Sequence, residues 1–73
     1  MSTYKTMTPV DLGDNATEND LMQFQAMCRE AQKLHPDLDD VQITNAVWYD
    51  GDYYRGARRL GVDVASVVGW EWT

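Results

Sequence analysis

The strongest constraint on the fold is an apolar stripe with helical spacing in the first half of the chain. Between residues 18 and 35, apolar side chains recur every three or four positions, which places them on one face of an α-helix. Thr17 and Asp20 form a capping pair before the stripe and Pro36 follows it, so the pattern predicts a helix over residues 18–35. Its buried face is expected to comprise Leu21, Phe24, Met27 or Cys28, Ala31 and Leu34.

Residues 41–72 are compatible with two kinds of secondary structure, of which the first is a sheet. Their β-branched and aromatic content favours strands. Asp50-Gly51 would form a two-residue hairpin turn between strands 41–49 and 52–60, and residues 67–72 would add a third strand. This interpretation predicts an α+β fold, with one helix packed on a three-stranded antiparallel sheet.

The second interpretation is helical, and the spacing of capping residues favours it. Asp39 or Asp40 would open a helix that ends near residue 49, and Asp52 would open a short helix that continues to about residue 60. Gly61 would end that helix, and Asp63 would open the last one. We therefore expect an all-α fold, a small domain of three to four helices.

A recognisable spacing supports the helical interpretation of residues 51–71. Ala57 precedes Gly61 by four positions and Val67 follows it by six, and the run from Leu60 to Val62 leads to Trp70-Glu71. A small residue at position 57 lets two helices approach, and glycine at 61 accepts a turn conformation that a Cβ would penalise. This segment resembles the helix-turn-helix core of Fis-like and Cro/repressor-type domains.

The resemblance implies a helix-turn-helix-like C-terminal half and a DNA-binding transcriptional regulator. In those domains the second helix enters the major groove and reads bases with Arg, Lys, Asn or Gln. The matching positions here carry no basic or amide side chain, which disfavours base-specific recognition. They are Asp63, Val64, Ala65, Ser66, Val68 and Gly69.

The first residues of the chain differ in composition from the rest. Thr, Ser and acidic residues prevail, and Pro9 and Gly13 interrupt the segment. Because few groups there are suited to burial, residues 1–17 are expected to form a flexible acidic arm. In a less favoured alternative Met7, Val10 and Leu12 dock on the domain. A chain of 73 residues has room for one small globular domain, expected at residues 18–73.

Charge is distributed unevenly along the chain. The net charge is −6, with −7 before Tyr53 and +1 from Tyr53 onward. Arg55, Arg58 and Arg59 form the only basic cluster, and at this spacing they share one side of a helix. They are expected to contact phosphates or an acidic partner, or else to lie solvated beside acidic residues, namely Asp37, Asp39 and Asp40.

Aromatic residues are concentrated in the same part of the chain, and six of the eight fall between residues 48 and 72. A core this small cannot bury all of them, and exposed Trp and Tyr beside Arg are typical of interface centres. In the alternative, Trp48 and Trp70 are core residues and the tyrosines cover them. The predicted partner-binding residues are Arg55, Arg58, Arg59, Tyr53, Trp70 and Trp72.

Catalytic, metal-binding and cofactor-binding patterns are not found in this sequence. Cys28 and His35 lie about 10 Å apart along a helix axis, too far for a nucleophile and its base. Asp37, Asp39 and Asp40 are not followed by the glycine and glutamate of a calcium loop. We expect no enzymatic activity, no metal and no cofactor. The single cysteine favours a reducing, cytoplasmic location, and no apolar run is long enough to cross a membrane.

These features leave three candidate functions. The preferred one is a small non-catalytic regulator that docks on a protein partner, with homodimerisation possible. The second is a helix-turn-helix DNA-binding regulator, whose arginines would contact the DNA backbone. The third is an acidic mimic of nucleic acid that blocks a DNA-binding protein, for which the −7 segment before Tyr53 is the basis.

Overall fold

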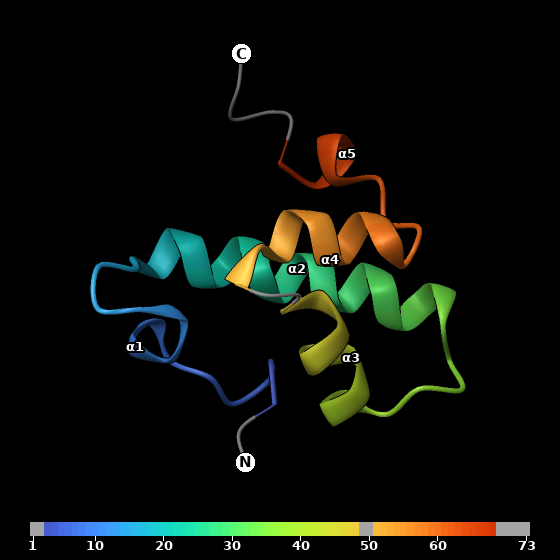
Figure 1. Cartoon of the computed structure of the whole chain (residues 1–73), viewed down its shortest axis with the longest axis horizontal. Coiled ribbons are helices and arrows are strands. Elements are labelled where there is room, and N and C mark those ends of the chain that lie inside the picture. The colour runs from blue at the N-terminus through green and yellow to red at the C-terminus, as the bar shows by residue number, and fades with distance from the viewer. Residues whose placement is uncertain (1–2, 49–50, 69–73) are drawn as a thin grey trace.

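The computed structural model describes residues 3–48 and 51–68, and its regular secondary structure in these ranges is helical (Figure 1). These ranges contain no β-strand, so the all-α prediction is confirmed and the sheet alternative is wrong. The five helices are α1 (Pro9–Leu12), α2 (Glu18–Leu34), α3 (Asp40–Val47), α4 (Tyr53–Arg59) and α5 (Val64–Val68).

The helices after α2 begin at the predicted aspartates. Asp39 accepts a hydrogen bond from the Gln42 amide at 2.8 Å, and Gln42 returns the contact by accepting from the Asp39 amide at 2.9 Å. Asp52 accepts from the Arg55 amide at 3.1 Å. These side chains accept hydrogen bonds from backbone N–H groups that have no partner within the first turn of a helix. The resulting preference for helix outweighs the β-propensity of the valines and aromatic residues.

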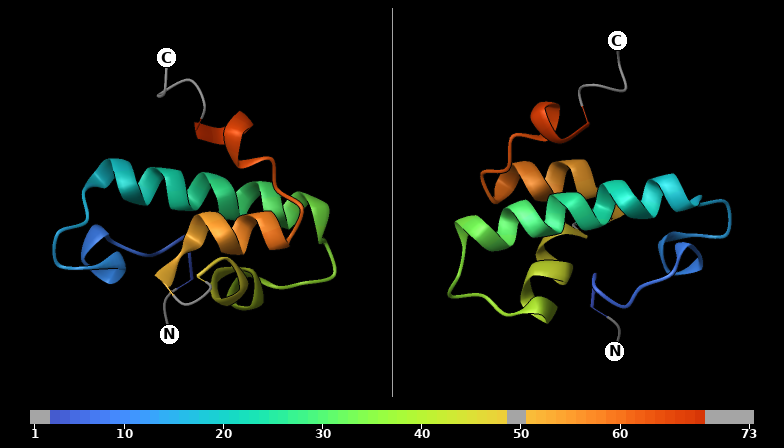
Figure 2. Two further views of the ribbon diagram at one scale, coloured as in Figure 1. Left: turned by 45° about the horizontal axis from the view of Figure 1, so that its top comes forward. Right: turned by 180° about the vertical axis from the view of Figure 1, so that it is seen from behind.

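Helix α2 is the axis of the molecule, and each of the other four helices contacts it (Figures 1 and 2). It begins at the predicted capping pair: Thr17 accepts from the Asp20 amide at 3.2 Å, and Asp20 accepts from the Thr17 amide at 2.9 Å. It ends one residue before the predicted position. Leu34 was placed on the buried face, and that prediction is wrong, because Leu34 lies in the last turn and is 55% exposed.

Helix α4 lies alongside α2 in all three views, and α3 packs against both of them (Figures 1 and 2). The closest approach is at Gly56, where a Cβ would overlap the carbonyl oxygen of Val47 and lie 2.7 Å from that of Ala46. The small residue expected to let the helices approach was Ala57, which is indeed fully buried. The residue that must be glycine at the α3–α4 contact is Gly56.

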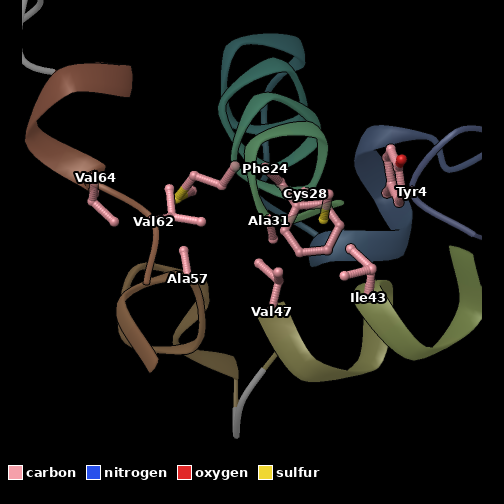
Figure 3. Close-up of a cluster of buried hydrophobic side chains, with 10 residues drawn as sticks. Tyr4, Phe24, Cys28, Ala31, Ile43, Val47, Ala57, Val62 and Val64 are labelled. Atoms are coloured by element: carbon pink, nitrogen blue, oxygen red, sulfur yellow. The ribbon is translucent and has the colours of Figure 1, made fainter. Parts of the chain in front are cut away.

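The core lies between α2, α3 and α4 (Figure 3). Helix α2 supplies Phe24, Met27, Cys28 and Ala31, and α3 supplies Ile43 and Val47. The C-terminal half adds Ala57, Val62 and Val64, so burial continues through the turn after α4. Gly61 in this turn has a φ of +89°, which confirms the predicted glycine conformation.

The N-terminal segment packs against the other helices, contrary to the prediction of an arm. Tyr4 is a core residue, 3% exposed, and its backbone amide donates to Thr44 Oγ1 at 2.8 Å. Gln25 of α2 donates to the Tyr4 carbonyl oxygen at 2.8 Å. Met7 and Leu12 also pack on the core, and Val10 stays exposed. The arm prediction is therefore wrong for residues 3–12, because one ring and directed backbone hydrogen bonds compensate for their polar composition.

Candidate functional site

The predicted arginine cluster lies on the solvent side of α4. Gly56 and Ala57 bury the opposite side of this helix against α2 and α3. The cap at Asp52 fixes where the helix starts, and therefore which residues point outward. Arg55, Arg58 and Arg59 are all exposed, at spacings of three and four residues. We call these three residues the arginine face.

Two of the three acidic residues proposed beside the arginines are engaged elsewhere. Asp40 forms an ion pair with Lys5 at 3.1 Å, and this contact raises the pKa of the Lys5 ammonium. Asp39 caps α3. The other ion pair within residues 3–48 and 51–68 joins Lys33 to Glu30. Neither Arg55 nor Arg58 forms an ion pair with an acidic residue in these ranges.

An aromatic cluster joins the start of α4 to α2 and to the end of α3. Tyr53 stacks on Trp48, with ring centroids 5.8 Å apart, and meets the edge of Phe24 at 5.5 Å. Burial, followed by the nearby charge of Asp20 and the neighbouring Tyr54, raises the pKa of the Tyr53 phenol. Tyr53 is therefore half-buried and packs between these helices. Trp70 and Trp72, predicted at the same surface, lie outside the described residues.

A groove between α2 and α5 was not found from the sequence. Its volume is about 370 Å³, and Met22, Ala26 and Val67 line it together with polar side chains of α2. Met22 is 64% exposed. The signal in the sequence was a methionine outside the apolar stripe of residues 18–35. We call this site the α2–α5 groove.

The last described helix presents little that could read a base. Val64 is buried, and Asp63 accepts a capping hydrogen bond from the Ser66 amide at 3.3 Å. The exposed side chains between residues 63 and 66 are those of Asp63, Ala65 and Ser66. In geometry the segment is a seven-residue helix, a glycine turn and a five-residue helix.

Cys28 is a buried core residue, and His35 forms a hydrogen bond between two helix ends. Burial raises the pKa of the Cys28 thiol to about 12, so the thiolate needed for nucleophilic attack is not formed near neutral pH. His35 Nε2–H donates to the Leu60 carbonyl oxygen at 2.6 Å, which ties the end of α2 to the end of α4. Within the described part of the chain, no three side chains of His, Cys, Asp or Glu are placed to hold a metal ion together.

None of the helices in the described ranges is both long and apolar enough to span a bilayer. Comparisons of the chain with protein-family models, with curated proteins and with solved structures find no match. The molecule therefore offers two candidate functional surfaces, the arginine face of α4 and the α2–α5 groove.

Proposed function

We propose that this protein is a small non-catalytic regulator that docks on a protein partner through the arginine face. The observation that carries the proposal is that Arg55 and Arg58 are exposed on one side of α4 and pair with no described acidic residue. This occurs in a chain with twice as many acidic as basic residues. Guanidinium groups bind carboxylates in a two-point geometry, so such a surface suits an acidic patch on another protein.

The charge of the rest of the molecule favours a protein over nucleic acid. The chain carries −7 before Tyr53, and α2 and α3, which pack against α4, belong to this region. A DNA duplex is uniformly anionic, so it would attract the arginine face and be repelled by the net negative charge of the region before Tyr53. A protein surface can place an acidic patch next to basic residues and so match both regions.

The DNA-binding alternative has a turn with suitable glycine geometry but a poor reading helix. Helix α5 has five residues, and its described exposed side chains are Ala65 and Ser66. Neither supplies the bidentate contact on which major-groove readout depends. The acidic-mimic alternative would use the −7 region and would leave the arginine face without a role.

The proposal is tested with two polyanions that differ in charge pattern. NMR titrations of the full chain would use a short glutamate-rich peptide and a random 20-base-pair DNA duplex at low salt. We expect the peptide to shift the amide signals of α4 in fast exchange and the duplex to cause no binding. Arg58→Glu should weaken peptide binding at least threefold, and the matched charge change Lys33→Glu should leave it unchanged.

Three results would contradict the proposal. Duplex binding that is tighter than peptide binding and falls steeply with salt would favour the helix-turn-helix regulator. Peptide binding that is equally insensitive to Arg58→Glu and Lys33→Glu would remove the arginine face as the docking surface. Binding of neither probe would also contradict the proposal, and it is the result expected of an acidic mimic of nucleic acid.

A further inference from the structure

The α2–α5 groove has the composition of an anchor site for one apolar side chain. Met22 and Ala26 of α2 and Val67 of α5 supply apolar surface, and Asn19, Gln23 and Gln25 supply amides around it. Its volume of about 370 Å³ is near the lower end of ligand pockets, where one large side chain fits. Apolar surface combined with polar groups is common in protein–protein contacts.

Among the apolar residues that line the groove, Met22 is the most exposed. It is 64% exposed on a helix whose opposite face is fully buried, so no packing within the described core uses it. Methionine is unbranched and adapts its shape to an incoming group, which suits a surface that must receive a side chain from outside.

Charge selects the kind of partner that fits this groove. Among the described residues, Arg29 is the only charged one that lines the groove, and it forms no ion pair with an acidic residue in these ranges. Arg29 and Gln25 also line a neighbouring hollow of about 210 Å³ together with Lys5. A segment that places an apolar side chain in the groove would therefore gain by carrying carboxylates beside it.

The groove and the arginine face are connected through one hydrogen bond. Tyr54 of α4 donates its hydroxyl to Gln23 Oε1 at 2.7 Å, and Gln23 lines the groove. Tyr54 is four residues before Arg58, so the two are neighbours on the surface of α4. Because α2 and α4 run side by side, a single partner element can contact both surfaces (Figures 1 and 2).

We infer that the partner presents an acidic amphipathic helix, with an apolar side chain that enters the α2–α5 groove. Its carboxylates pair with Arg29 at the groove and with the arginine face on α4. Amphipathic helices are recognised in this way, through apolar anchors one turn apart and charges that flank them. This inference rests on the proposed docking function, and it adds the class of partner and a second contact surface.

The test uses three synthetic peptides of about 15 residues, a length at which Ala-rich helices begin to form in water. The first combines Ala and Glu with two Leu residues four positions apart, the second replaces the Leu residues by Ala, and the third replaces Glu by Gln. We expect the first to bind the full chain and to shift amides near Met22, Arg29 and Arg58. The second and third should each bind about tenfold more weakly.

Variants of the protein separate the groove from the arginine face. Met22→Gln should weaken the first peptide about tenfold, which corresponds to losing one apolar contact. Val10→Gln is the matched control, since Val10 is equally exposed on α1 and lies away from the groove. Arg29→Gln should weaken binding of the first peptide and leave binding of the third, Gln-containing peptide unchanged.

The outcomes distinguish this inference from the proposed function. If Arg58→Glu weakens binding of the first peptide and Met22→Gln does not, the inference about the groove is wrong and the proposed docking through α4 is retained. If Met22→Gln weakens binding of the first peptide and Arg58→Glu does not, the proposed docking through the arginine face is wrong and the inference about the groove is retained. Groove signals that move with protein concentration alone would assign the groove to a second copy of the chain and overturn the inference.

Discussion

The N-terminal segment, residues 3–12, and the C-terminal half, residues 53–67, both pack on α2 and α3, and different contacts hold them. The N-terminal segment is mostly exposed and polar, and directed bonds fix it: Thr44 accepts from the Tyr4 amide, and Gln25 donates to the Tyr4 carbonyl oxygen. The C-terminal half is held mainly by close packing of buried surfaces. Gly56 touches the backbone of α3, and Val62 and Val64 are buried behind α4.

This difference shows that a segment can join a small core by two routes. A polar segment needs few buried side chains if its backbone groups find partners, because each unpaired buried amide would be destabilising. An apolar segment needs a close fit, because dispersion and burial depend on contact over the whole surface. The following substitutions test whether the two regions depend on these different contacts.

Gly56→Ala should have the largest effect. The added Cβ would overlap the Val47 carbonyl oxygen and lie 2.7 Å from that of Ala46, and neither backbone group can rotate away. We expect α4 to be displaced and the free energy of unfolding to fall by about 4 kcal/mol, measured by urea unfolding followed by circular dichroism. Ala57→Gly, the neighbouring change in the opposite sense, should cost about 1 kcal/mol. Equal effects would mean that helix propensity, and not close approach, dominates here.

Tyr4→Ala should have the next largest effect and tests the N-terminal segment. Removing a fully packed ring should lower the free energy of unfolding by about 3 kcal/mol. Tyr4→Phe retains the ring and is the matched control, expected to unfold close to the parent. Cys28 offers a second measurement, because its buried thiol should react faster with a thiol reagent if the core is opened. An unchanged stability of Tyr4→Ala would restore the interpretation of residues 1–17 as an arm.

The residues that sequence analysis placed correctly act locally. Thr17, Asp39 and Asp52 each cap the helix that follows within three residues, so the signal and the structure are in the same short stretch. The same holds for Gly61, whose φ of +89° is a property of one residue. Local signals therefore predicted four helix starts or ends and decided against the sheet.

The residues that were missed depend on distant parts of the chain. Tyr4 finds its partner in Thr44, forty positions away, and no pattern near Tyr4 announces it. Gly56 is required because the backbone of α3 comes close to α4 at this position. That approach depends on how the segment between the two helices connects them. The groove at Met22 exists because α5 lies beside α2. Arg55 and Arg58 were found, since helical spacing alone places them together, but their lack of described acidic partners needed coordinates.

Thr44→Val isolates one directed bond of the N-terminal segment. Thr44 Oγ1 accepts from the Tyr4 amide at 2.8 Å and donates to the Asp40 carbonyl oxygen at 2.7 Å. Valine keeps the shape and leaves the Tyr4 amide without an acceptor, so unfolding should become easier by about 2 kcal/mol. Hydrogen exchange of the Tyr4 amide should accelerate, with Thr44→Ser as the control that retains the hydroxyl. If valine and serine behave alike, the Thr44 hydrogen bond does not hold the segment, and its remaining contacts are the Tyr4 ring and the Gln25 hydrogen bond.

Gly61→Ala should have the smallest effect and sharpens the contrast within the C-terminal half. Its φ of +89° is unfavourable for alanine, but the nearest side-chain atom, Leu34 Cδ1, would lie 3.8 Å from the new Cβ, an ordinary contact. The expected loss of unfolding free energy is therefore only conformational, about 1 kcal/mol. Gly61→Asn should recover part of it, since asparagine tolerates positive φ better. Gly51→Ala, also at positive φ and with nothing near its Cβ, should match it. A loss at Gly61 as large as that at Gly56 would mean that the turn, more than the contact with α3, holds this half in place.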